Sequence, residues 1–388
     1  MPAQNRFRHQ TYQSPVLTSQ VHLLRPEHPP PSDGEEHRQR MRAVGQRLRA
    51  AQVRAIYLVH GTFVGTDALG LLAELERVWP SACDLVRRWQ KQTLDAVAGD
   101  MGNYTQAYAD AFSAGINGAD AEPHIPVRLF HWSSENHHVG RAQAAIELLR
   151  TLVSRPEECD GRVLLWGHSH GGNVFALLTN LLAADEETRR RFFRAARPHY
   201  RVPLLKFFDF PVWREMQRAL RDKACDIRRT KLDFVTFGTP VRYGWDSDGY
   251  SKLLHFVFHR PVDGLPECQA LFPPTVDDVL TARYGDYIQQ IGIAGTNFAP
   301  GLLSCRTLVA DWRLNRFLQP GIRGRDLLAR LRLGLRTHAD GESLLVDYGP
   351  TQAHIGQHLA GHAIYTRLEW LLFHAEEVAR RFYTTDAG

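Results

Sequence analysis

A serine stands between a strand pattern and a helix pattern, and this arrangement most constrains how the chain can fold. Residues 162–167, RVLLWG, are typical of a buried strand, and the helical pattern NVFALLTNLL follows closely. Between them lies Gly167-His168-Ser169-His170-Gly171-Gly172. Glycines two positions before and after a serine relieve crowding in a tight strand-to-helix turn. Such a turn would expose the Ser169 hydroxyl as a nucleophile, whereas the simpler interpretation is a glycine turn with a capping serine.

Three further apolar segments resemble RVLLWG and alternate with helical patterns along the chain. They cover residues 53–61, 125–133 and 231–238. Strands that are apolar on both faces and alternate with helices are typical of a parallel sheet that is covered on both sides. The sequence therefore predicts an α/β fold with a doubly wound, mostly parallel sheet.

Two regions differ from this alternation. Residues 1–50 are polar and contain HPPPSDGEEHRQR, which predicts a partly disordered arm that ends in a helix at residues 38–51, before a main domain at 51–388. Residues 184–230 are rich in arginine and aromatic residues and too long for a simple connection, so we expect an inserted helical cap or lid. A lid would turn apolar side chains to the substrate and basic ones to lipid head groups, and a plain cap would only complete the core.

Composition narrows the class of protein. The 388 residues are 44% hydrophobic and 23% charged, as in globular proteins. No apolar run approaches the roughly 18 residues of a membrane span, and the amino terminus lacks the apolar core of a signal peptide. We expect no transmembrane segment and, by default, a cytoplasmic location, with signal-independent delivery outside the cell as the alternative.

The sequence also indicates which cofactors and partners to expect. The five cysteines are widely spaced without a CxxC pair, and the histidines lack metal-ligand spacing. No phosphate-binding loop or dinucleotide motif occurs, so we expect neither a metal nor another cofactor. The net charge of +5 permits peripheral contact with an anionic membrane surface, while no motif that reads nucleic acid supports such a partner.

Acyl transfer needs backbone N–H donors for the oxyanion that develops on the substrate, and two places could supply them. The segment Val59-His60-Gly61-Thr62-Phe63 closes the first apolar strand, and His170 directly follows the serine. We expect the amides of Thr62 and His170 to form the oxyanion hole, although an ordinary strand-end turn is the simpler interpretation of the first segment.

These motifs resemble those of the α/β-hydrolase superfamily, in particular serine esterases and lipases, including the fungal-type class 3 lipases. VHGTF is similar to the superfamily's oxyanion loop and GHSHGG to its nucleophile elbow. VTFGTPVRYG resembles a TFGSPRVG strand end of the class 3 lipases. The resemblance covers residues 53–383 and implies an ester hydrolase with a triad in the order serine, acid, histidine, the serine being Ser169.

The histidine of such a triad belongs in the loop between the last strand and the last helix, where it can reach the serine. His354, His358 and His362 all lie there. GHAIY around His362 resembles the DHLSYF-like histidine segment of class 3 lipases and directly precedes the last amphipathic helix. We therefore prefer His362, with solvated loop histidines as the simpler interpretation of the other two.

The acid has several candidates. HFVFHRPVDGLP resembles the acid-bearing NDPVPRLP stretch of class 3 lipases, but the family's aspartate falls on Arg260, so the nearest carboxylate is Asp263. Asp246 follows the fourth strand and is the rival. If IGIAGTNF were a later strand, Asn297 would stand in the acid's place. Each carboxylate could instead serve only as a turn or cap residue. We prefer Asp263.

Together these residues predict a serine hydrolase that cleaves carboxylic esters, lipid esters above all, through an acyl-enzyme intermediate. An acyltransferase would use the same triad and deliver the acyl group to an alcohol. A hydrolase-fold protein that binds a lipid or a protein without catalysis is the alternative from another class, because a fold does not determine an activity.

Overall fold

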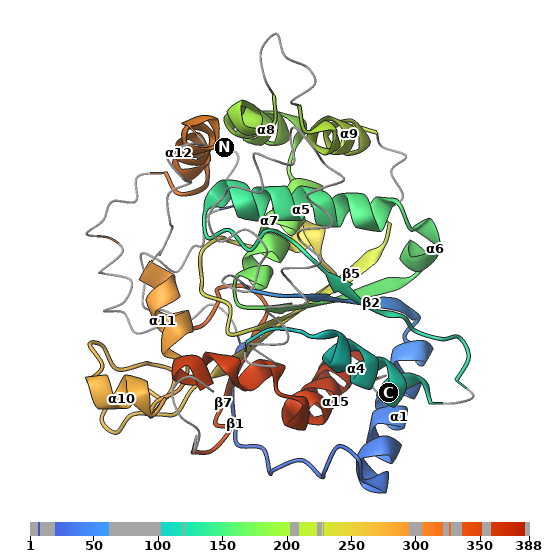
Figure 1. Cartoon of the computed structure of the whole chain (residues 1–388), viewed down its shortest axis with the longest axis vertical. Coiled ribbons are helices and arrows are strands. Elements are labelled where there is room, and N and C mark those ends of the chain that lie inside the picture. The colour runs from blue at the N-terminus through green and yellow to red at the C-terminus, as the bar shows by residue number, and fades with distance from the viewer. Residues whose placement is uncertain are drawn as a thin grey trace.

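The structure, a computed structural model, describes residues 7, 20–61, 102–118, 121–201, 209–222, 227, 229–294, 305–320, 326, 336–350 and 358–384. Seven strands in this part of the chain form one parallel sheet in the order β1-β7-β6-β5-β4-β2-β3 (Figure 1). The strands are β1 (Gln20–Leu24), β2 (Val53–Val59), β3 (Val127–Phe130), β4 (Arg162–His168), β5 (Lys231–Phe237), β6 (Lys252–Phe258) and β7 (Glu342–Val346). The predicted parallel α/β sheet is confirmed.

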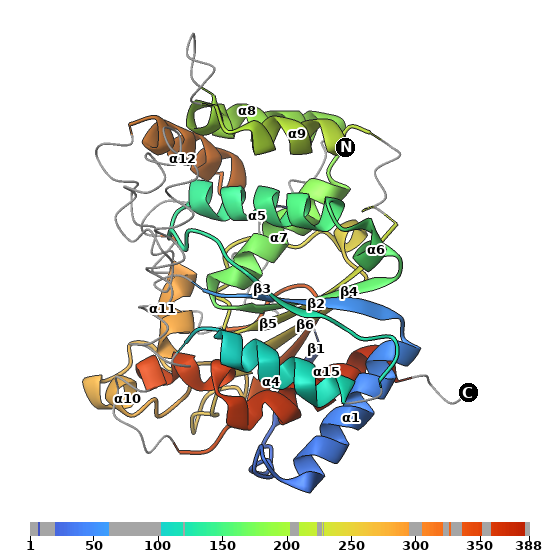
Figure 2. The same cartoon turned by 45° about the vertical axis from the view of Figure 1, so that its right-hand side comes forward.

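Helices cover both faces of the sheet (Figure 2). One face carries α1 (Glu35–Ala50), α4 (Gln106–Asn117) and α15 (Leu371–Tyr383), and the other α5 (His138–Val153) and α7 (His170–Ala183). The remaining helical segments are α6 (Pro156–Cys159), α8 (Glu186–Tyr200), α9 (Pro211–Ala219), η4 (Ser247–Gly249), α10 (Val276–Leu280), α11 (Tyr287–Ala294), α12 (Cys305–Leu318), η5 (Leu359–Thr366) and η6 (Leu368–Trp370).

The central strands are apolar throughout because each contributes to two cores. In β4, Val163 and Leu165 pack with the residues of α5 and α7, whereas Leu164 and Trp166 pack with those of α4 and α15. All four side chains are at most 1% exposed. Alternate residues of a strand point to opposite faces, so a strand covered on both sides needs an unbroken apolar run. This requirement explains why RVLLWG could be identified as a strand.

The described residues of the predicted insertion at 184–230 form an outer layer over α5. Helices α8 and α9 belong to it, and α12, from a later part of the sequence, packs beside α8 (Figures 1 and 2). Its aromatic side chains Phe192, Phe193 and Trp213 are at most 1% exposed, and Trp213 stacks on Tyr200 with 4.9 Å between ring centroids. The described part of the insertion therefore packs as a helical cap whose aromatic residues complete a core. No described helix is long and apolar enough to cross a membrane.

Residues 20–50 differ from the polar arm that their composition predicts. β1 pairs with β7 at the edge of the sheet, and α1 packs against α15 and α4. Met41, Val44 and Leu48 of α1 are at most 3% exposed, and their spacing of three and four residues places them on one helix face. The helix expected at residues 38–51 is confirmed as α1. Composition hides only the apolar stripe that packs this helix, because the charged residues around the stripe lower the average hydrophobicity.

Candidate active site

Ser169 lies at the junction of β4 and α7 with its backbone at φ 53° and ψ −129°. Non-glycine residues rarely adopt a positive φ, and a surrounding structure must hold them there. The Ser169 N–H donates to the Phe237 carbonyl of β5 at 2.8 Å, and the Thr239 hydroxyl donates to the Ser169 carbonyl at 2.7 Å. The end of β5 therefore fixes the turn that the GHSHGG motif predicts.

The end of β2 lies directly against this turn. A Cβ atom on Gly61 would stand 2.5 Å from the Cβ of Ser169, so only glycine fits there. The Ser134 hydroxyl donates to the Gly61 carbonyl at 2.9 Å, and Trp132 Nε1 donates to the His60 carbonyl at 2.9 Å. These bonds hold the start of the predicted oxyanion loop beside Ser169, and Thr62 itself lies outside the described residues.

His170 begins α7, so its amide belongs to the helix N-terminus that faces Ser169. The first N–H groups of a helix have no carbonyl partner within the helix and favour negative charge in front of them. The His170 ring is buried, which lowers its pKa well below the usual value, and the guanidinium groups of Arg141 and Arg242 lower it further. The ring is therefore neutral at pH 7. The backbone amide of His170 is a suitable oxyanion donor because it lies at the helix N-terminus.

His362 lies in η5, after β7 and before α15, as the sequence predicts. Gly361 precedes it with φ 93°, and a Cβ there would meet the Gly285 carbonyl oxygen at 2.6 Å. This close approach brings the His362 backbone onto the segment that carries Asp286. The His362 side chain is buried, and its Nε2 has no hydrogen-bond partner among the described residues.

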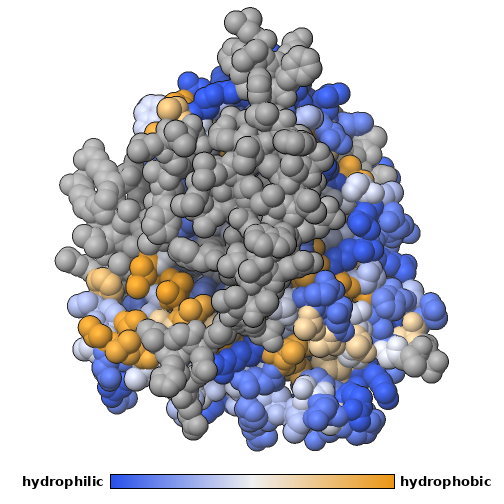
Figure 3. Space-filling view, in the orientation of Figure 1, coloured by the Kyte–Doolittle hydropathy of each residue, from blue (hydrophilic) through white to orange (hydrophobic). Residues whose placement is uncertain are grey.

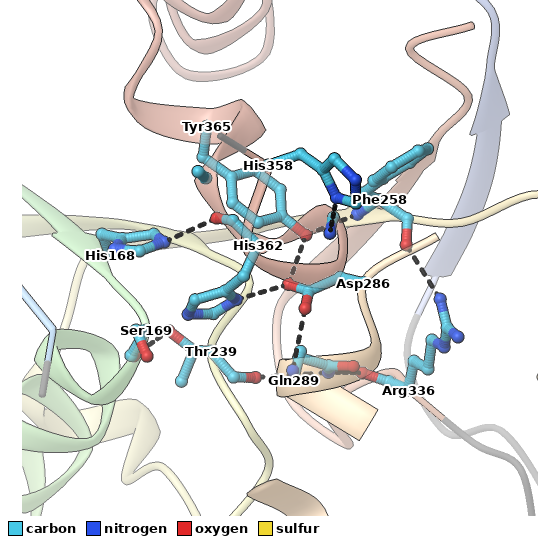
Figure 4. Close-up of polar contacts among 12 residues, drawn as sticks. His168, Ser169, Thr239, Phe258, Asp286, Gln289, Arg336, His358, His362 and Tyr365 are labelled. Atoms are coloured by element: carbon cyan, nitrogen blue, oxygen red, sulfur yellow. Dashed lines mark hydrogen bonds and ion pairs between the residues drawn. The ribbon is translucent and has the colours of Figure 1, made fainter. Parts of the chain in front are cut away.

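Asp286 is the carboxylate that binds His362. Its Oδ2 lies 2.7 Å from His362 Nδ1 and accepts a hydrogen bond from the Tyr365 hydroxyl at 3.0 Å. Its Oδ1 accepts from the Gln289 amide at 2.8 Å, and the side chain is fully buried. A carboxylate oxygen accepts the hydrogen bond from His362 Nδ1, so Nδ1 carries the ring proton and Nε2 keeps its lone pair. Figure 4 shows the His362 ring between Asp286 and Ser169.

Asp286 reaches this place although it follows β6 by 28 positions. The Asp286 N–H donates to the carbonyl of Phe258, the last residue of β6, at 3.0 Å, and His259 forms an antiparallel bridge with Gly285. The chain thus leaves β6, makes an excursion that includes α10, and returns to the same strand end. Buried Arg336 donates to the carbonyls of Phe258 and Tyr284 at 2.9 and 3.0 Å and holds the return in place.

The structure does not bring the two sequence-derived acids to His362. Asp263 is exposed in a turn after β6. Asp246 caps η4, where its carboxylate accepts from the Asp248 amide at 3.2 Å and its own amide faces Thr179. Thr179 lies ten residues beyond Ser169, about 15 Å along a helix. The choice of Asp263 and its rival Asp246 is therefore replaced by Asp286.

The other candidates also have definite places. His358 is buried and caps η5, with its Nδ1 accepting from the Gly361 amide at 3.2 Å. IGIA, residues 291–294, ends helix α11 rather than forming a strand. His354 and Asn297 lie outside the described residues. From the sequence, Asp286 could be identified only as a helix cap, because aspartate is common directly before a helix. It does cap α11, since its carboxylate accepts from the backbone amide three residues later.

His168, which precedes the serine, contacts the candidate base directly. Its Nε2 donates to the His362 carbonyl at 3.1 Å, and the two rings lie 4.5 Å apart between centroids. Burial lowers the pKa of His168 well below its usual value, and the neighbouring His362 lowers it further. The ring is therefore neutral, and its Nε2–H supports the backbone that carries the His362 side chain.

In the part of the chain that the structure covers, no group of three or more histidine, cysteine, aspartate or glutamate side chains could hold a metal ion. The polar groups around Ser169 instead form the hydrogen-bonded chain from Asp286 to His362. No family model, curated protein or solved structure matches this chain.

Proposed function

We propose that this protein is a serine hydrolase of the α/β-hydrolase type that cleaves carboxylic esters, lipid esters above all. The hydrogen bond between the buried Asp286 and His362, on the side of the ring away from Ser169, carries the proposal. It gives His362 the tautomer of a general base beside a serine on a strained turn. The order serine, acid, histidine along the chain is that of the superfamily which the motifs resemble.

In the proposed reaction, Ser169 Oγ attacks the ester carbonyl carbon while its proton moves to His362 Nε2. The amide of His170, together with that of Thr62 as the sequence suggests, donates to the oxyanion. The tetrahedral intermediate collapses as the ester C–O bond breaks, and the leaving alcohol takes the proton from His362. Water then attacks the acyl-enzyme with His362 again as base, which releases the carboxylic acid and restores Ser169.

The test of this proposal is labelling of the full chain with a fluorophosphonate probe, followed by assays with p-nitrophenyl esters of increasing acyl length. We expect one labelled residue, Ser169, because only an activated serine attacks the probe rapidly. Hydrolysis of the esters should follow, with long acyl chains preferred. A chain that neither labels nor hydrolyses any ester would contradict the proposal, and transfer to an added alcohol in preference to water would identify an acyltransferase.

His168 should act as a positioning residue for His362, and its loss should separate activity from stability. We expect His168→Phe to lower kcat by about 10- to 100-fold with little change in KM, because a small displacement of the base is costly. The melting temperature should fall only slightly, since the variant keeps a buried ring and the hydrogen bond to the His362 carbonyl is a neutral one, worth about 1 kcal/mol.

The matched variant His168→Gln keeps an N–H donor and should retain most of the activity. Measuring kcat, KM and melting temperature for both variants distinguishes positioning from general structural support. Full activity in His168→Phe, or equal loss in both variants, would contradict this role.

A further inference from the structure

The large hydrophobic side chains that the described part of the chain exposes gather on one side of the molecule. Of nine such residues, two lie on α10, two on α11, three on α12 and one, Leu359, on η5. The three helices lie on the same side in Figures 1 and 2, and Figure 3 shows hydrophobic residues gathered over α10 and α11. Concentrated exposed apolar surface is typical of interaction sites rather than of ordinary protein surface.

Helix α12 presents this surface most clearly. Its buried residues Ala310, Leu314 and Leu318 face the cap core, whereas Leu308, Val309 and Trp312 are 40%, 43% and 57% exposed. The guanidinium of Arg316 stands 4.9 Å from the centre of the Trp312 ring. The outer face of α12 therefore combines aliphatic residues, a tryptophan and arginines, a combination that suits the boundary between hydrocarbon and water.

Positive charge is concentrated beside the same helix. Helices α8 and α12 together hold eight arginines and three carboxylates, a surplus of five that equals the net charge of the whole chain. Both glutamates of α8 pair with Arg190. Arg194, Arg197 and Arg313 are exposed and have no carboxylate partner within the described residues. Helices α8 and α12 thus carry a positive charge equal to the net charge of the whole chain, and the other residues together have a formal charge of about zero.

The two helices present these groups together. The Arg191 guanidinium lies 5.5 Å from the centre of the Phe317 ring, which joins α8 to α12. We propose that the outer face of α8 and α12, called here the cap face, binds an anionic lipid membrane surface, with Trp312 at the boundary and the arginines on lipid head groups. The proposal goes beyond the reaction above and does not require it.

Lipid fits the cap face better than the other polyanions or a protein. Nucleic acid would be held by the arginines alone and gains nothing from exposed Leu308 and Val309. A protein partner usually covers an apolar centre that is poor in charge, whereas here arginines stand within one helical turn of Trp312. Arginine stems can lie along hydrocarbon while the guanidinium groups reach phosphate.

The experiment measures vesicle binding by the full chain in a Ser169→Ala background, so that hydrolysis does not consume the lipid. Vesicles of phosphatidylcholine and phosphatidylglycerol in equal parts are compared with vesicles of phosphatidylcholine alone. We expect binding to the mixed vesicles that weakens as salt rises, because salt screens the attraction. Equal binding to both kinds of vesicle would overturn the proposal.

Variants locate the binding surface. The pair Arg313→Gln and Arg316→Gln, made together, should weaken binding to mixed vesicles by about 30-fold. Trp312→Ala should weaken it by about tenfold and keep the salt dependence. The matched control is Arg38→Gln with Arg42→Gln on α1, at the opposite end of the molecule, which removes the same charge and should change binding by less than about twofold.

Two results would overturn the assignment of the cap face. One is equal loss in the α1 control, which would mean that only net charge matters. The other is binding of duplex DNA that exceeds binding to vesicles and is indifferent to Trp312→Ala. Since all measurements use a chain without the nucleophile, failure here leaves the proposed ester hydrolysis untouched, and failure of hydrolysis leaves the binding result valid.

Discussion

Ser169→Ala is expected to abolish fluorophosphonate labelling and to lower kcat for ester hydrolysis by about 10⁵-fold or more. The methyl group cannot attack the substrate, so the acyl-enzyme route is lost while binding groups and oxyanion donors remain. Replacing a strained serine by alanine changes little of the fold, because the bonds of Ser169 to Phe237 and Thr239 involve only its backbone.

The matched control is Ser154→Ala, an exposed serine that ends α5 and is not part of the turn at Ser169. It should label and hydrolyse at the wild-type rate. Circular dichroism and the melting temperature of Ser169→Ala should match those of the wild type. Persistent labelling of Ser169→Ala at another serine would show that the nucleophile lies elsewhere.

Asp286→Asn is expected to lower kcat by about 10⁴-fold with little change in KM. The asparagine oxygen can still accept from the Gln289 amide, which turns its NH₂ group toward His362 Nδ1. Nδ1 then becomes the acceptor, the imidazole proton moves to Nε2, and the base for Ser169 is lost. The protonated ring that forms during acyl transfer also loses its neighbouring negative charge.

Asp263→Asn and Asp246→Asn serve as controls, since neither carboxylate contacts His362, and both should retain wild-type kcat. The double variant Ser169→Ala with Asp286→Asn should be no less active than Ser169→Ala alone, because residues that act as a unit are not additive. Wild-type kcat in Asp286→Asn, or a large loss in Asp263→Asn, would contradict the triad proposed here.

Much of the scaffold can be predicted from local patterns. The four apolar runs that sequence analysis takes as strands are β2, β3, β4 and β5, because a strand covered on both faces needs apolar residues at every position. The turn at Ser169 is likewise local, since GHSHGG stands between two strong patterns. His362 can be placed in the correct loop because only one segment lies between the last strand and the last helix.

The edges of the domain are harder to predict from the sequence than the central strands. β1 has five residues and lies at the sheet edge, and α1 carries a narrow apolar stripe in a charged sequence. Their stability comes from pairing with β7 and from packing on α15, contacts that no local average reports. α12 joins the cap although it begins 86 positions after the end of α9, because its place depends on contact with α8.

The sequence by itself determined the parallel sheet, the serine turn and the loop of the histidine, since each depends on residues that are neighbours in the chain. Tertiary structure alone decided which carboxylate binds His362. Asp286 looks like a helix cap, and its carboxylate meets His362 only because the chain returns to the end of β6 and Gly361 lets η5 approach. A side chain's partner across 76 positions follows from how the backbone closes in space, and no periodicity in the sequence encodes that closure.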